Sequence, residues 1–297
     1  MICMNFYLSL RLVRFIGAAS LLLTLLSGTG LAKTPVRVST EKQKSEEIIS
    51  KHLLSIGPAD ARMSIKTRVL EGLAHFRPQV AGQFDAQGTS IFASEGTKSV
   101  LGMKFTVAAY QRELIAFDGV QVTSAYFKPG DRSVLSDYLL PKKVIFQHGL
   151  FGGALSTGWA LLHFTPEKAD IEYGGLKKLD DTEAYLLRYK PKGSSDVTIQ
   201  LYFEKSTFHH IRTDYEQIVS AQMGETPEKS AQQITERYRV SEEFDDFWND
   251  QGLVLPHYYK LIYSINGGRK FVWHLEFQKM TNNQVIDPKS FVIFTNK

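Results

Sequence analysis

The sequence predicts an α+β protein in which one curled antiparallel sheet, a half-barrel, is covered by a helical lid. Three observations support this fold class. Most of the chain consists of short segments in which apolar and polar residues alternate, as in strands with one buried face. Short turns rich in Gly, Asn and Asp separate these segments, and they favour antiparallel pairing because parallel strands need long crossovers. Helical patterns are confined to the start of the chain and to the stretch 129–164.

The start of the chain has the pattern of a secretory signal peptide. Arg11 and Arg14 precede a short apolar run, 15–26, and Gly30 and Ala32 are the small residues expected before a cleavage site. The apolar run is short for a membrane span, and a retained anchor is the alternative. We expect residues 1–32 to be removed after Ala32, which predicts a periplasmic or secreted protein.

Composition narrows the class of function. Cys3 is the only cysteine and lies in the leader, so the mature chain has neither a disulfide nor a thiol nucleophile. The formal charge of +4 becomes +2 without the two leader arginines, which is too small to indicate a nucleic-acid partner. The remaining chain is long enough to bury a sizeable core. We expect one domain, 33–297, with the helical insert 129–164.

The first element of the mature chain is a helix that ends at Gly57 and Pro58. Ser39 or Thr40 is a suitable N-cap. One face, recurring at helical spacing, consists of Ile48, Ile49, His52, Leu53 and Ile56.

About ten strands follow, and the clearest is 270–279, where Phe271 and Trp273 alternate with Val272 and His274. The segment 196–205 has the same pattern. The other candidates are 67–76, 89–96, 99–110, 113–127, 183–191, 206–215, 233–240 and 255–265. Consecutive strands joined by short turns predict a meander, either a barrel or a strongly curled sheet.

The insert interrupts the strands. Helices are predicted over 130–140 and 153–164, with an apolar strand over 142–147 and a glycine-rich turn between them. Together with the N-terminal helix, the insert is the available cover for the apolar face of the sheet.

The predicted sheet carries many large apolar side chains, which are candidates for a ligand cavity. Two or three helices need not fill the hollow of a curled sheet, and an incompletely filled apolar hollow is a site for an acyl chain or similar ligand. The alternative is an ordinary packed core. The cavity candidates are Phe105, Phe117, Leu201, Phe203, Phe271, Trp273, Leu275 and Phe277.

Four stretches, in order, resemble bacterial lipoprotein carriers of the LolA/LolB type and the related periplasmic regulators of the RseB/MucB type. They are the helix and first strand, the central strands, a late strand introduced by Leu-Pro, and a closing segment with an Asn-Asn turn and a D-P-x-x-F ending. These stretches cover 46–76, 181–215, 253–262 and 277–293.

The resemblance implies an unclosed eleven-stranded barrel with a helical lid and an apolar cavity that receives acyl chains. It implies carriage of a lipid or an acylated protein across the envelope, with membrane-associated donor and acceptor proteins as partners. The alternative is a regulatory lipid sensor that binds a protein partner. This chain is longer than a typical carrier. Arg68, Arg112 and Arg212 all remain open as the counterpart of the cavity arginine of carriers.

The stretch 147–159, QHGLFGGALSTGW, raises the alternative of a hydrolase that uses His148, since a histidine followed by glycines can form an oxyanion hole. The Gly-x-Ser-x-Gly nucleophile elbow of such enzymes is absent from the sequence. The simpler interpretation is that Gly149, Gly152 and Gly153 allow a sharp turn. We therefore expect no catalytic residue and no enzymatic activity.

Leu150, Phe151 and Trp159 are candidates for a lid or gate. The first two either tuck inward or form a mobile apolar tip at the cavity mouth. Trp159 is expected in a lid helix, with a helix on the membrane surface as the alternative.

No metal or cofactor is expected, because the eight histidines lack metal-ligand spacing. His209 and His210 are adjacent in a strand and should point to opposite faces, His210 to that of Phe208 and Arg212. The acidic clusters 180–181 and 242–246 are interpreted as solvated turns.

Overall fold

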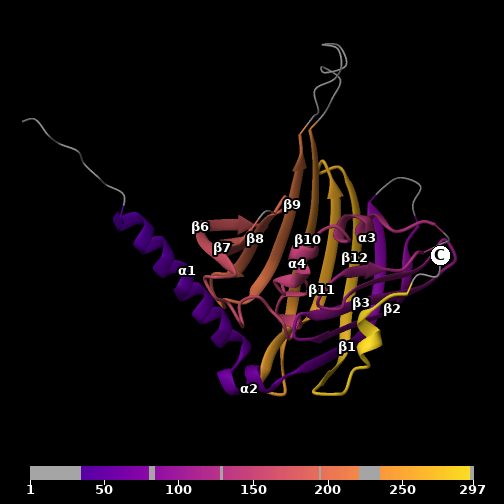
Figure 1. The fold of residues 1–297 in the computed structure, drawn as a ribbon, viewed down its shortest axis with the longest axis horizontal. Coiled ribbons are helices and arrows are strands. Elements are labelled where there is room, and N and C mark those ends of the chain that lie inside the picture. Colours follow the sequence, from indigo (N-terminus) through magenta and orange to yellow (C-terminus); the bar gives the residue numbers. More distant parts are fainter. Residues whose placement is uncertain (1–34, 80–83, 128–129, 194, 221–234, 295–297) are drawn as a thin grey trace, which may run out of the picture.

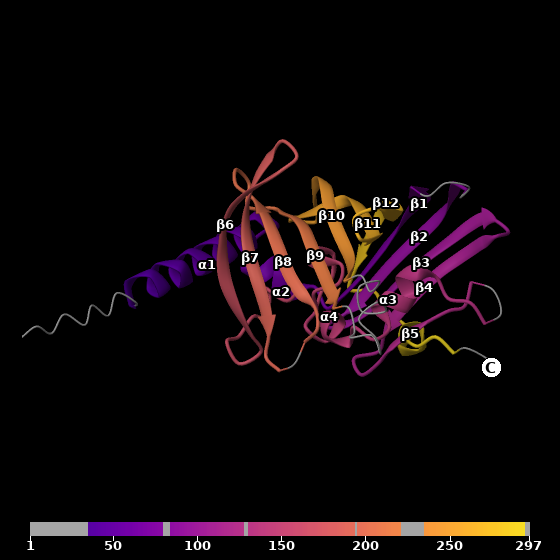
Figure 2. The same ribbon diagram turned by 90° about the horizontal axis from the view of Figure 1, so that it is seen from above.

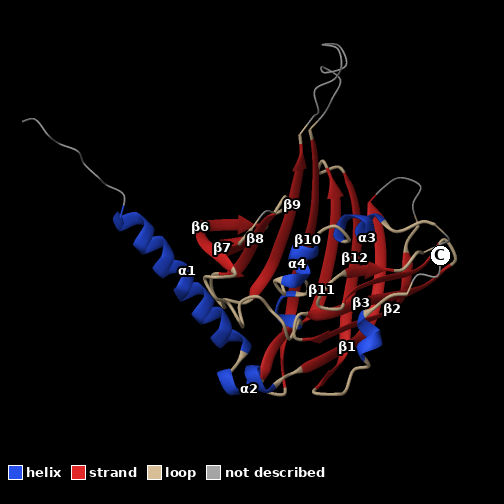
Figure 3. Cartoon of the chain, in the orientation of Figure 1, coloured by secondary structure: helices blue, strands red, loops and turns tan. Residues whose placement is uncertain are grey.

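The computed structural model describes residues 35–79, 84–127, 130–193, 195–220 and 235–294; the expected signal peptide, 1–32, lies outside them. One antiparallel sheet of twelve strands dominates the described residues and does not close (Figures 1 and 3). Its strand order is β5-β4-β3-β2-β1-β12-β11-β10-β9-β8-β7-β6. Apart from the meeting of β1 with β12, every pair consists of consecutive strands, so the predicted meander is confirmed, with twelve strands in place of about eleven.

The strands have the following bounds: β1 Thr67–Gln79, β2 Ala86–Glu95, β3 Lys98–Val107, β4 Tyr110–Phe117, β5 Val122–Ser124, β6 Ala169–Leu179, β7 Thr182–Pro191, β8 Thr198–Glu204, β9 His210–Val219, β10 Glu236–Asp250, β11 Leu253–Ile265 and β12 Arg269–Asn282.

Helices are few and mostly short. They are α1 Pro35–Ile56, α2 Ala59–Ser64, α3 Val134–Leu139 and α4 Lys143–Gln147, with two 3-10 turns at Gly153–Leu155 and Pro288–Phe291. Within the described residues, no helix is both long and apolar enough to cross a membrane. The fold is therefore mostly β, with less helix than the α+β prediction implied.

The two sides of the sheet differ in what covers them. Figure 2 shows the sheet bent into an open arc, with α3 and α4 on its inner side and α1 running beside β6. The largest apolar cluster lies between the inner face and the insert. On the outer face, Phe291 of the C-terminal 3-10 turn packs against a smaller cluster of Val69, Ala93, Val100 and Ala116.

The insert differs from its prediction in two places. The segment 142–147 was expected as a strand, and that was wrong: Lys143–Gln147 is helix α4, whose apolar Ile145 and Phe146 are both buried. The expected helix over 153–164 is also wrong beyond its first three residues, which form one 3-10 turn followed by further turns. Gly158 explains part of this difference, because a Cβ there would lie 2.2 Å from the carbonyl oxygen of Gly96. The glycine lets the chain pass close to the β2–β3 turn.

Two strands were missed or cut short in the prediction. Strand β6 was not predicted, since Gly174 and Gly175 interrupt its alternation where the register with β7 shifts. The acidic cluster 242–246 was interpreted as a solvated turn, and this was wrong because β10 runs through it. Consequently Glu242, on the inner face of β10, is fully buried.

Candidate functional site

Seven of the eight cavity candidates lie in the core of the inner face. Phe105, Phe117, Leu201, Phe203, Trp273, Leu275 and Phe277 are at most 5% exposed and belong to one apolar cluster. Phe271 is the exception, since it is partly exposed at the start of β12. The alternation of the sequence therefore identified the face correctly, and the structure shows that most of this face is covered.

The insert provides that cover, and its three lid candidates are buried. Leu150, Phe151 and Trp159 are at most 2% exposed. The Phe151 ring lies 4.9 Å from that of Phe146 and 6.3 Å from that of Phe92, measured between ring centroids. In this structure Leu150 and Phe151 thus tuck inward, the first of the two arrangements expected for them.

Trp159 joins the insert to both α1 and β9. Its indole Nε1 donates a hydrogen bond to Nε2 of His52 at 3.0 Å, and its ring stacks on His210 with 4.7 Å between centroids. His52 Nδ1 lies 3.0 Å from the carbonyl oxygen of Phe208, so this nitrogen carries the proton and Nε2 is free to accept. Burial lowers the pKa of His52 to about 3, which keeps the ring neutral.

His210 faces the core, whereas Arg212, which was expected to share its face, lies on the outer side of the sheet. Its Nε2 lies 2.8 Å from the hydroxyl of Thr213, and its Nδ1 is buried with no hydrogen-bond partner among the described residues. The predicted alternation failed because the register of β9 with β8 shifts between His210 and Arg212, where Ile211 is an extra residue. A one-residue irregularity moves a side chain to the other face.

Glu242, on the inner face of β10, connects the sheet to the insert by hydrogen bonds. Its carboxylate accepts hydrogen bonds from the backbone N–H of Gly152 at 2.7 Å and from the hydroxyls of Tyr215 at 2.6 Å and Tyr259 at 2.5 Å. Burial raises the pKa of Glu242 to about 7, although these three hydrogen bonds act in the opposite direction. A buried carboxyl with three donors is a fixed attachment point for the glycine turn.

Arg68 adds a second attachment point. Its guanidinium donates to the carbonyl oxygens of Ala154 at 3.0 Å and Leu155 at 3.1 Å, and its Nε donates to Asn282. Of the three arginines considered as a counterpart of the carriers' cavity arginine, Arg68 is the one that is buried beneath the insert.

The glycine-rich turn does not form an oxyanion cradle here. The N–H groups of Gly149, Gly152 and Gly153 donate to Phe146, Glu242 and Leu150, so all three are engaged within the protein. Gly152 has a φ of 82° and lies against the Phe92 ring, at a position where a Cβ would come within 2.4 Å. His148 is paired with the Tyr189 hydroxyl at 2.9 Å. These contacts favour a structural role for the turn.

An apolar hollow of about 290 Å³ remains on the inner side, beyond the insert. It lies between β1, β12, the β3–β4 turn and the segment that leads into α3. Its lining residues are Phe76, Phe84, Ala109, Tyr110, Phe127, Arg132, Ser133, Val134, Phe271 and Trp273. We call this hollow the apolar pocket. Two of the cavity candidates, Phe271 and Trp273, lie on its wall.

A buried polar network forms the base of the apolar pocket. Trp273 Nε1 donates to the Tyr110 hydroxyl at 2.9 Å, and that hydroxyl donates to Glu113 at 2.5 Å. The hydroxyl of Ser136, in α3, also donates to Glu113 at 2.5 Å. Burial raises the pKa of Glu113. The network fixes the positions of Tyr110 and Trp273, and with them the shape of the pocket.

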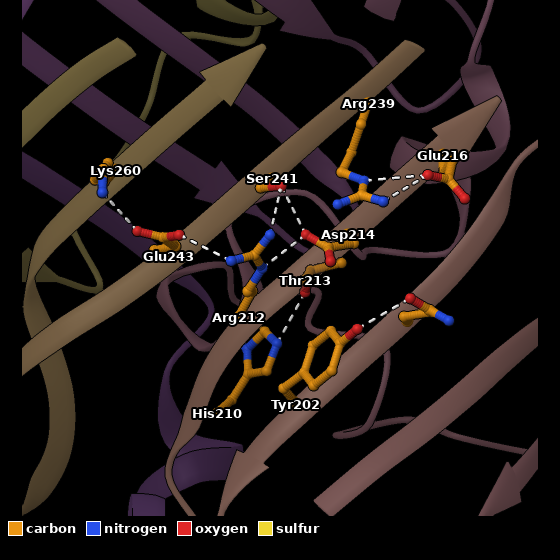
Figure 4. Close-up of polar contacts among 11 residues, drawn as sticks. Tyr202, His210, Arg212, Thr213, Asp214, Glu216, Arg239, Ser241, Glu243 and Lys260 are labelled. Atoms are coloured by element: carbon orange, nitrogen blue, oxygen red, sulfur yellow. Dashed lines mark hydrogen bonds and ion pairs between the residues drawn. The ribbon is translucent and has the colours of Figure 1, made fainter. Parts of the chain in front are cut away.

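The outer face of β9, β10 and β11 is polar and well paired (Figure 4). Arg212 lies between Asp214, with Nε–Oδ1 at 2.8 Å, and Glu243, with Nη1–Oε1 at 3.1 Å, and Lys260 Nζ reaches the other oxygen of Glu243 at 2.7 Å. Since these two cations and two carboxylates pair with one another across neighbouring strands, this row is a cross-strand charge ladder.

A larger hollow, about 1080 Å³, lies on the outer face of β1–β4. Its walls include Glu71, Lys104 and Arg112 beside Ile91 and Leu114. This mixed, solvent-facing lining suits an apolar ligand less well than the aromatic wall of the apolar pocket. Within the described residues, no group of three or more His, Cys, Asp or Glu side chains could hold a metal ion.

The sequence missed Glu242, Glu113 and Arg132. Glu242 and Glu113 occupy inward positions of strands whose neighbours at i±2 are Val240, Phe244 and Ile115, so the period-two pattern was the signal that could have identified them. Arg132 carries no such signal, because it belongs to a segment without a repeating pattern.

Comparisons with known proteins concern the fold. No protein-family model and no curated protein matches the chain. Among solved structures, a LolA superfamily protein from Nitrosomonas europaea is 13% identical, with a TM-score of 0.46, covering 84% of this chain and 97% of that one. A putative outer membrane lipoprotein-sorting protein domain from Vibrio parahaemolyticus is 8% identical, with a TM-score of 0.42 and coverages of 84% and 96%.

MucB, in the Pseudomonas aeruginosa MucA/MucB complex, is also similar, at 9% identity and a TM-score of 0.22, with coverages of 80% and 100%. The structures that this chain resembles thus include the two groups that its sequence resembles. At these identities the likeness is one of fold.

Proposed function

We propose that this protein reversibly binds the acyl chain of a lipid or an acylated protein in the periplasm. The observation that carries the proposal is the apolar pocket, about 290 Å³, whose wall is built mainly from aromatic side chains. Ligand sites are typically concave and mostly apolar with a few polar groups, and they begin at about 300 Å³. Each methylene group buried there contributes about 0.8 kcal/mol, so a short stretch of chain already gives useful affinity.

Movement of the insert would enlarge the binding site. Its side chains occupy the inner face of the sheet, where Phe151 and Trp159 pack among the cavity candidates. Besides its apolar packing, the insert is attached by discrete polar contacts, from Glu242 to Gly152 and from Arg68 to Ala154 and Leu155. A longer acyl chain enters by displacing the insert from the inner face, which turns the buried cavity candidates into the wall of a larger cavity.

Binding of this kind serves two biological roles. A carrier passes its cargo between membrane-associated donor and acceptor proteins, and a sensor contacts a protein partner when it is loaded. Both need reversible binding and neither needs covalent chemistry. We favour the carrier, and the regulatory sensor is the alternative; they differ in what the loaded protein contacts.

The test uses two neighbouring alanines in the exposed β3–β4 turn. Ala109 lines the apolar pocket, whereas Ala108 is exposed in the same turn and does not. Ala109→Trp should block the pocket and weaken binding of a neutral fluorescent acyl-chain probe at least tenfold. Ala108→Trp adds the same bulk next to the pocket and should leave the affinity within twofold.

Native mass spectrometry of protein purified from its own host should in addition detect a bound acyl species. A wild-type protein that binds no acyl probe, or equal affinities for the two tryptophan variants, would contradict the proposed site.

A further inference from the structure

Among the described residues that line the apolar pocket, one is charged, Arg132. No carboxylate is among the residues that line the pocket. Arg132 is partly exposed. The described lining therefore combines a mostly apolar wall with a single positive charge.

The guanidinium of Arg132 is held in place without being neutralised. Its Cζ lies 4.2 Å from the centroid of the Tyr126 ring, a cation–π arrangement that orients the guanidinium plane. The structure gives no ion pair to Arg132 within the described residues. Its Nε is buried and has no hydrogen-bond partner there. A buried donor without an acceptor costs about 1–3 kcal/mol, which a ligand acceptor would recover.

A second arginine shows that an unpaired Nε is not sufficient. Arg62, in α2, also has a buried Nε without a partner among the described residues. The hollow beside Arg62 measures about 10 Å³, compared with about 290 Å³ beside Arg132. A head group has room only at Arg132, and Arg62 is therefore a natural control.

We infer that the ligand of the apolar pocket is an anionic amphiphile, whose carboxylate or phosphate group is held by Arg132 while its acyl chain lies against Phe76, Phe271 and Trp273. This inference rests on the function proposed above. The chemistry is that of a guanidinium, which presents a planar fork of N–H donors matched to the two oxygens of a carboxylate or phosphate. A neutral head group offers only uncharged acceptors, whose hydrogen bonds to a guanidinium are weaker, and a cationic head group would bring two cations together.

The experiment compares four amphiphiles with the same dodecyl chain. Dodecanoate, dodecyl phosphate, dodecyl maltoside and dodecyltrimethylammonium displace a neutral fluorescent probe from the wild-type protein. We expect an anionic member to bind at least tenfold more tightly than the maltoside, and the cationic member to bind most weakly. The carboxylate and phosphate arms distinguish a fatty acid from a phospholipid as the source of the head group.

Variants then assign the preference to Arg132. Arg132→Gln should abolish the tenfold preference, because the anionic members lose their charged partner. Arg132→Lys keeps the charge without the fork and should retain only part of the preference. Arg62→Gln should retain all of it.

The outcomes separate this inference from the proposed function. A wild-type protein that binds all four chains equally, or an Arg132→Gln protein that keeps the preference, overturns the inference and leaves acyl-chain binding intact. A protein that binds none of the four chains overturns both. If Arg132→Gln does not fold, the preference of the wild-type protein and its partial loss in Arg132→Lys still decide the question.

Discussion

The two halves of the inner face have the same kind of sequence and different cover. In the half formed by β8 to β11, the insert fills the hollow, and Trp159 lies against His52 and His210 with no exposed surface. In the half formed by β1, β4 and β12, an aromatic wall that includes Phe76 and Phe271 stays partly uncovered and borders the apolar pocket. An apolar strand face is thus not a cavity by itself, because the covering segment decides whether space remains.

We call the half that the insert fills the closed half and the other the open half. The closed half is packed like a protein interior, and buried polar groups fix the position of the insert there. Glu242, Arg68 and His52 each use directed hydrogen bonds to fix one part of the insert or its neighbouring helix. Such buried polar groups contribute little to net stability but are costly when a partner is removed. The open half has the Tyr110–Glu113–Ser136 network, which shapes a wall and leaves the space before it free.

The largest expected effect is that of Trp159→Ala, which tests whether the closed half is true core. Removing a fully buried indole leaves a large cavity and an unpaired His52 Nε2, so the free energy of unfolding should fall by about 3–5 kcal/mol. Trp248 is the control, since it is 55% exposed, and Trp248→Ala should cost less than about 1 kcal/mol. Urea unfolding followed by circular dichroism measures both. Equal costs for the two variants would show that the insert is not a packed part of the core.

The next prediction concerns how the free energy of unfolding depends on pH through Glu242, which attaches the insert to the sheet. The carboxyl titrates near pH 4.5 when unfolded and, because of burial, near 7 when folded. Between these values the folded protein keeps a proton that the unfolded chain has lost. This carboxyl therefore favours the folded state most below pH 4.5, and its contribution falls as the pH rises toward 7.

Glu242→Gln removes this titration while keeping a side chain of the same shape. The free energy of unfolding of the variant minus that of the wild-type protein should therefore increase by about 3 kcal/mol from pH 4.5 to pH 8. The difference between the two proteins cancels the titration of the histidines, including His52. Urea midpoints of both proteins at several pH values give the result. A difference that does not change with pH would mean that Glu242 is ionised at its usual pKa.

The sequence predicted which strand residues face the core better than it predicted which segments cover that face. Alternation placed Phe203, Trp273 and Leu275 correctly on the inner face, because a half-buried strand requires it. The same pattern, applied to β10, would have placed Glu242 inside; its acidic neighbours Asp245 and Asp246 hid this by making the segment resemble a solvated turn.

The remaining errors arise from tertiary contacts that no local pattern contains. The segment 142–147 is apolar and short, and at that length periodicity does not separate a strand from a buried helix. His210 and Arg212 lie on opposite faces because the register of β9 with β8 shifts between them. The position of the apolar pocket depends on where the insert stops covering the sheet. Its volume is the space left between the sheet and the segments that cover it, and no local sequence pattern contains that information. For this reason Arg132 could not be identified from the sequence.

The smallest expected loss of stability, that of Phe271→Ala, belongs to the sharpest test of the comparison, because this test uses two residues of one strand and one face. Leu275 is fully buried and does not line the apolar pocket, and Leu275→Ala should lower the free energy of unfolding by about 2–5 kcal/mol. Phe271 is partly exposed and borders the apolar pocket, so Phe271→Ala enlarges an existing space and should cost about 1 kcal/mol.

The order should reverse for binding of a neutral acyl-chain probe. Phe271→Ala removes part of the wall that the chain contacts and should weaken binding several-fold, while Leu275→Ala, measured where the protein is still folded, should change it less than twofold. Unfolding curves and probe titrations on the same two proteins give both rankings. If Leu275→Ala weakened binding more than Phe271→Ala, the acyl chain would bind in the covered part of the inner face and not in the apolar pocket.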